Sequence, residues 1–67
     1  MKYVIIRPSK LFVVKKVNDD EIHLETYKDP NTEIKNKYIM VDDKKLTIYS
    51  VKDNYQDARK LCNAYNR

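Results

Sequence analysis

The stretch Asp53–Asn66, DNYQDARKLCNAYN, is the only segment of the chain with a clear helical period. Its apolar residues recur every three or four positions, which places them on one stripe of an α-helix. The stripe consists of Tyr55, Ala58, Leu61, Cys62 and Tyr65. A helix this short is not stable alone in water, so the sequence predicts that it packs on a sheet formed by the preceding residues.

The two ends of the expected helix carry capping signals. Asp53, with Gln56 three residues later, has the spacing of a capping box, in which the Asp side chain accepts hydrogen bonds from amides of the first turn. Asn66 suits a left-handed helix end, and Arg67 suits the negative end of the helix dipole. We therefore expect the helix to begin at Asp53 and to end at Asn66.

Upstream of the helix, segments rich in β-branched and aromatic residues alternate with turn-forming residues. The expected strands are Tyr3–Arg7, Leu11–Val17, Glu21–Tyr27, Lys37–Val41 and Leu46–Ser50. We expect Lys28–Asn36 to be a mobile polar loop, with Ile34 folding back to the core, and Asp42–Lys45 to be a four-residue hairpin turn. The sequence predicts one α+β domain over residues 1–67: a five-stranded antiparallel meander, as an open sheet or a small barrel, with one C-terminal helix packed on it.

One short helix can cover only one face of such a sheet, yet the first, second and fourth strands carry apolar side chains on both faces. The candidates for the uncovered face are Tyr3, Phe12, Val14, Tyr38 and Met40. Closure into a barrel, a homodimer or an outside partner would each cover them. Because the chain has no Gly to form kinks at barrel corners, we expect association, with a homodimer favoured.

Composition excludes several classes of protein. Without Gly there is no phosphate-binding Gly-rich loop and no dinucleotide fingerprint. No apolar run approaches the about 20 residues that span a bilayer, and the start MKYVIIRPSK lacks the features of a signal peptide. We therefore expect a soluble cytoplasmic protein with no membrane partner.

The groups that could carry catalysis all have simpler interpretations. Glu21, His23 and Glu25 share one strand face, where they could hold a metal, but a charged row among lysines is more typical of cross-strand ion pairs. The acid pairs Asp19–Asp20 and Asp42–Asp43 lie in expected turns. Cys62 lies on the apolar stripe of the helix and is expected in the core. We expect no enzyme activity, no metal and no cofactor.

Two kinds of partner remain open. Exposed Tyr and Met residues beside apolar strands are typical of protein interfaces. The residues expected to bind a protein partner are Tyr38, Met40, Tyr49, Phe12 and Tyr3. The alternative is a small basic nucleic-acid-binding module, because the net charge is +4 and tyrosines are interspersed with basic residues. The lysines expected to serve it are Lys15, Lys16, Lys44 and Lys45.

The composition rich in Lys, Asn, Asp, Ile and Tyr, the strand meander and the terminal helix with Asp53–Ala58 and Leu61–Asn66 resemble the small accessory proteins of phages that infect AT-rich Gram-positive bacteria. The resemblance implies a non-enzymatic protein that binds and sterically inhibits a host protein of replication, transcription or defence, in the cytoplasm of the bacterial host cell. A DNA mimic would be strongly acidic, so the net charge of +4 speaks against that strategy.

Overall fold

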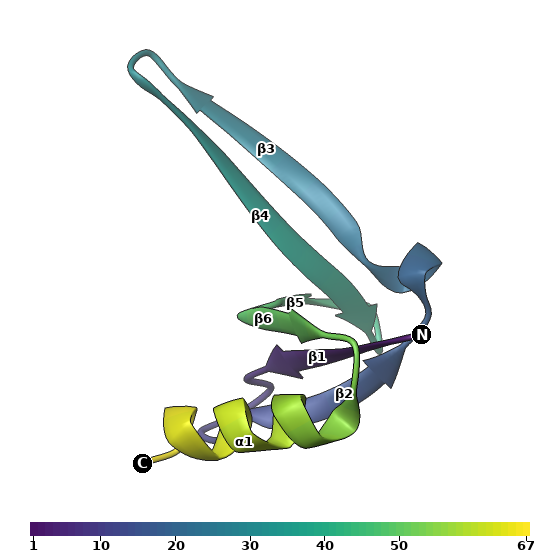
Figure 1. The fold of residues 1–67 in the computed structure, drawn as a ribbon. Helices are drawn as coiled ribbons and strands as arrows, with labels where there is room; N and C mark the ends of the chain where they lie inside the picture. The colour runs from purple at the N-terminus through teal and green to yellow at the C-terminus, as the bar shows by residue number, and fades with distance from the viewer.

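A computed structural model describes residues 1–67, apart from the side chain of Asp29. The chain forms two antiparallel sheets of three strands each and one C-terminal helix (Figure 1). The elements are β1 (Lys2–Ile6), β2 (Val13–Val17), the 3-10 turn η1 (Asp19–Glu21), β3 (His23–Asp29), β4 (Thr32–Val41), β5 (Lys44–Thr47), β6 (Ser50–Lys52) and α1 (Tyr55–Tyr65). The α+β class and the C-terminal helix are thus confirmed.

The single five-stranded meander is wrong, because the strands divide into two sheets. The body sheet has the order β2-β1-β6, and the arm sheet has the order β3-β4-β5. The division falls inside the segment expected as the last strand: the Ile48 amide donates to the Lys37 carbonyl over 2.9 Å, while the next amide, of Tyr49, donates to the Ile5 carbonyl over 2.8 Å. Two consecutive amides therefore bond to different sheets, and β6 leaves β5 to pair with β1.

Both faces of the body sheet are covered by the chain itself. Tyr3 and Ile5 of β1 point to the side of α1, and Tyr3 lies edge-on against Tyr55 of the helix, 5.8 Å between ring centroids. Val4 and Ile6 point to the opposite side. Because β1 is central and covered on both faces, its apolar residues run without alternation, as in other fully buried strands.

The base of the arm sheet covers the second face of the body sheet. Val4 and Ile6 of the body sheet form one cluster with Ile39 of β4. The full cluster is Val4, Ile6, Val17, Ile39 and Ile48, with Ile22, Val41, Leu46 and Val51 packed around it. The expectation that a second molecule must cover this face is therefore wrong for the body sheet. The fold is neither the open sheet nor the small barrel that the sequence left open, but two stacked sheets.

The helix is shorter than expected, and its caps differ from those expected. Its N-cap is Asn54, one residue after the expected Asp53, and the Asn54 side chain accepts from the Asp57 amide over 2.9 Å. Ala58 and Cys62 are fully buried on the side that faces the body sheet, as the stripe predicts. Asn66 is not left-handed, with φ −87°.

Asn66 instead fixes the end of the helix to the segment before β2. Its side-chain oxygen accepts from the Phe12 amide over 2.8 Å, and its side-chain nitrogen donates to the Phe12 carbonyl over 2.9 Å. The Cys62 thiol contacts the same carbonyl at 3.2 Å. One side-chain amide thus bonds both backbone groups of a residue 54 positions away in the chain.

The connections in the arm sheet are two-residue turns. Pro30–Asn31 joins β3 to β4, so the expected mobile loop over Lys28–Asn36 is wrong and most of it is paired strand. The turn between β4 and β5 is Asp42–Asp43, and the expected turn residues Lys44 and Lys45 belong to β5. The β3–β4 hairpin is consequently long and projects from the rest of the molecule (Figure 1).

Candidate functional site

The projecting part of the β3–β4 hairpin, from Leu24 to Lys37, is named the arm here. None of its described side chains is buried. Side-chain burial along β4 begins at Tyr38 and Ile39, where the strand reaches the core. The arm nevertheless carries large apolar side chains, because Leu24 is 59% exposed, Tyr27 49% and Ile34 51%. Large apolar side chains exposed on a two-stranded extension make the arm the candidate binding element of the molecule.

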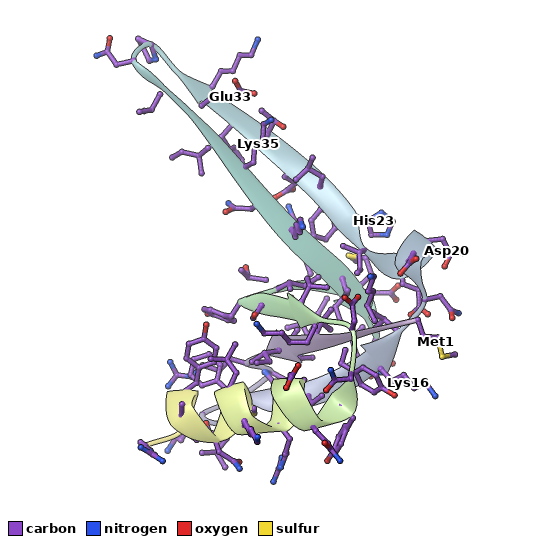
Figure 2. The ribbon with its side chains drawn as sticks, viewed as in Figure 1. Met1, Lys16, Asp20, His23, Glu33 and Lys35 are labelled. Atoms are coloured by element: carbon purple, nitrogen blue, oxygen red, sulfur yellow. The ribbon has the colours of Figure 1, made fainter. Side chains whose placement is uncertain are left out.

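The register of the arm sheet assigns its side chains to two faces. Ile39 packs into the core, so β4 residues of odd number face the body and those of even number form the outer face. The described side chains of the outer face are His23, Glu25, Tyr27, Thr32, Ile34, Asn36, Tyr38, Met40, Lys45 and Thr47. Figure 2 shows His23 at the base of the arm, on strand β3.

A contact network orders the middle of the outer face. The rings of His23 and Tyr38 stack with centroids 5.2 Å apart. The Lys45 ammonium lies 4.6 Å from the Tyr38 ring centroid and also pairs with Glu25. Glu25 accepts a hydrogen bond of 2.7 Å from the Tyr27 hydroxyl. Glu25 and Lys45 therefore neutralise each other's charge. The large side chains of Tyr27 and Met40 on the same face stay available to a partner.

The face of the arm toward the body has a different character. It carries Lys28, Lys35 and Lys37, with Glu33 as the acid among its described residues. Glu33 and Lys35 follow one another along the arm in Figure 2. Counted over the described side chains, the two faces of one hairpin thus differ in charge: the outer face is neutral and the face toward the body is cationic.

The residues expected to bind a partner lie in three places. Tyr38 and Met40 lie together on the outer face. Tyr3 packs against Tyr55 of the helix. Phe12 and Tyr49 lie edge to face, with centroids 5.0 Å apart, at the end of the body where the helix terminates. These five residues do not form one surface.

Sequence reasoning missed two residues of the outer face. Ile34 was expected to fold into the core but is half exposed on the arm, and Tyr27 was not among the candidates. The available signal was the alternation of uncharged with charged residues in Thr32–Lys37, TEIKNK, which continues the period of β4.

The four lysines expected to serve nucleic acid do not gather either. Lys15 and Lys16 are neighbours on β2 and point to opposite faces of the body sheet. Lys44 and Lys45 point to opposite faces of the arm sheet in the same way, and Lys45 is engaged with Glu25. The structure brings Lys35 and Lys37 together instead.

The groups considered for catalysis serve structural contacts. His23 stacks on Tyr38 and Glu25 pairs with Lys45, while Glu21 belongs to η1. Among the described side chains, no group of three or more His, Cys, Asp or Glu residues is placed to hold a metal ion. Cys62 is buried on the side of α1 that faces the body sheet.

Comparison with protein-family models, with curated proteins and with solved structures found no match to this chain. In the part of the chain that the structure describes, no helix is both long enough and apolar enough to cross a membrane.

Proposed function

We propose that the chain is a non-enzymatic binding module that places the outer face of its arm sheet on another protein. The observation that carries the proposal is the half exposure of Tyr27, Ile34 and Met40, between 49% and 51%, on one face of a projecting hairpin. Tyr and Met are enriched at the centres of protein interfaces, where a few such residues provide most of the binding energy.

The chemistry of this face favours a protein over a polyanion. Its Glu25 and Lys45 neutralise one another, so a phosphate backbone would find no uncompensated positive charge among the described side chains of this face. A protein surface with an apolar patch and a few hydrogen-bonding groups fits the alternation of Tyr, Ile and Met with Asn36 and the Tyr hydroxyls.

The resemblance to phage accessory proteins supports a host protein of the bacterial cytoplasm as the partner. A module of this size, with 67 residues, would act by occupying a surface that the host protein needs, so that inhibition is steric. The expected homodimer is a competing occupant of the same face, and the experiment below separates the two.

A photocrosslinking amino acid placed at Ile34 tests which protein meets the outer face. We expect irradiation in a bacterial lysate to link the chain to one protein, and the same group at Lys60, on the exposed side of the helix, to give no such product. The double substitution Tyr27→Ala, Met40→Ala is then expected to weaken binding of that purified protein by about thirtyfold or more, since hot-spot residues contribute about 2 kcal/mol.

Leu11→Ala is the matched control, because Leu11 is also exposed and apolar but lies in the β1–β2 connection. It is expected to leave the affinity unchanged. Equal affinity of the double variant and the parent chain would contradict the proposal. A crosslink from Ile34 to a second copy of the chain would assign the face to a homodimer and would overturn the choice of another protein.

A further inference from the structure

A groove lies where the arm meets the body, away from the outer face. Its volume is about 380 Å³, and its lining comes from two segments. One is Lys35–Lys37 of β4, and the other is Ile48–Val51, the connection between β5 and β6 with the start of β6. The Ile48 amide bonds the Lys37 carbonyl at the floor of this junction, so the two segments are held together by the backbone.

The charge of the groove is positive. Lys35 and Lys37 project from the same face of β4, and two strand residues place them about 6.7 Å apart. None of the described residues that line the groove is Asp or Glu. Among the described side chains the ion pairs are Lys2–Asp53 and Lys45–Glu25, so both groove lysines remain available to a ligand.

An aromatic residue forms part of the same lining. Tyr49 is 49% exposed, and its ring is held in place by Phe12, with an interplanar angle of 83°. Phe12 is itself packed against Tyr65 at 5.0 Å between centroids, and the Arg7 guanidinium lies 5.2 Å from its centroid. Tyr49 therefore shares the lining of one groove with Lys35 and Lys37, and Phe12 supports its ring.

We infer that this groove binds single-stranded nucleic acid, with Lys35 and Lys37 on phosphates and Tyr49 stacked on a base. A positive groove with an aromatic stacking residue is the combination that binds unpaired strands. Bases in a duplex have their faces occupied by neighbouring bases, so Tyr49 would find no partner there. The volume also fits a small ligand of a few groups and not a double helix.

Fluorescence anisotropy with a labelled oligothymidylate of about ten nucleotides tests the inference. Two phosphate contacts predict that the logarithm of the binding constant falls with the logarithm of salt concentration with a slope of about −1.4 between about 50 and about 200 mM. Lys35→Gln with Lys37→Gln is expected to remove most of this slope. Tyr49→Leu is expected to weaken binding about fivefold or more at an unchanged slope, and Tyr49→Phe to bind like the parent chain.

The matched control is Lys16→Gln with Lys60→Gln, which removes the same charge from β2 and the helix. It is expected to keep both affinity and slope, and the outer-face variant Tyr27→Ala, Met40→Ala is expected to bind the oligonucleotide normally. The inference is overturned if the control pair weakens binding as much as the groove pair. It is also overturned if a duplex of equal length or polyglutamate competes as well as the unlabelled single strand. Failure of this test would leave the protein partner of the outer face untouched.

Discussion

Asp42 and Asp43 carry the two positive φ angles of the described non-Gly residues, 51° and 64°. A two-residue hairpin turn with both central residues in the left-handed region prefers Gly at its second position. Asp43→Gly is therefore expected to raise the free energy of unfolding by about 0.5 kcal/mol, because it relieves a steric conflict of the Cβ atom. Urea denaturation of the variant and the parent measures the difference.

Asp20→Gly is the control, since Asp20 lies in the 3-10 turn η1 and has no positive φ. Its loss of chain stiffness is expected to lower stability slightly. Equal destabilisation by both substitutions would show that the turn at Asp43 is not strained.

The pair of Lys2 and Asp53 ties the start of β1 to the residue before the helix cap. Hydrogen bonding to Asp53 and its negative charge raise the pKa of Lys2, and the same bond with the charge of Lys2 lowers the pKa of Asp53. A lowered carboxyl pKa adds stability above its ordinary value of 3.8, and this part is lost as pH falls through the lower folded value. The raised lysine pKa adds stability below 10.5, lost as pH rises through the folded value.

The free energy of unfolding of the Asp53→Asn variant is expected to fall less steeply than that of the parent chain as pH drops below 3.8 and as pH rises above 10.5. Between these two values the two curves are expected to run parallel. Urea melts across both windows measure this. Because the Asp53 side chain is 82% exposed and the Lys2 side chain 36%, about 1 M salt should bring the two curves together. A difference that survives high salt would contradict the electrostatic origin.

At the scale of elements, the C-cap residue Asn66 attaches the end of the helix to the segment before β2. Asn66→Ala removes both side-chain bonds to Phe12 and is expected to lower the free energy of unfolding by about 1 to 2 kcal/mol. It is also expected to speed labelling of Cys62 by a thiol reagent under native conditions, since this thiol is covered while the helix end is docked. Asn63→Ala, on the exposed side of the helix, should change neither quantity.

The elements differ in how well the sequence predicts them. The helix was expected within two residues at its start and one at its end, because its period of 3.6 is complete. The first half of β4 was expected as a loop, because the apolar face that usually reveals a strand is absent where a hairpin has no core beneath it. Strand pairing was missed because alternation within Leu46–Ser50 cannot show that β5 stays with β4 while β6 joins β1.

Local sequence patterns likewise predict only part of the candidate sites. Tyr38 and Met40 were selected as exposed, and they do share one face. Tyr49 and Lys37 come together only through the junction of two sheets, which no local pattern encodes. The lysine pairs chosen for their adjacency in sequence diverge, because neighbouring residues of a strand point to opposite faces.

At the scale of the whole molecule, the arm and the body are expected to be separable. Replacing residues 26–35 by Asn-Gly joins Glu25 to its register partner Asn36 and keeps the strands in phase. Since none of the described side chains removed is buried, the melting temperature should change by only a few degrees. The shortened chain should no longer bind the purified partner that crosslinking identifies, because it lacks Tyr27 and Ile34. It should bind the oligonucleotide more weakly, because it lacks Lys35 and keeps Lys37 and Tyr49. A shortened chain that fails to fold, as measured by circular dichroism, would show that the arm stabilises the body.

The pairing of β1 with β6 joins Tyr3 to Lys52, which are far apart in the sequence, whereas β3 and β4 are joined by two residues. Closing so long a loop costs far more entropy than zipping a hairpin, so contacts of this kind slow folding. We therefore expect the rate-limiting event to be the arrival of the C-terminal third on β1. Until that arrival the apolar strand Val4–Ile6 has one side without a neighbour, and the time spent in this state sets how readily the chain aggregates while it is being made.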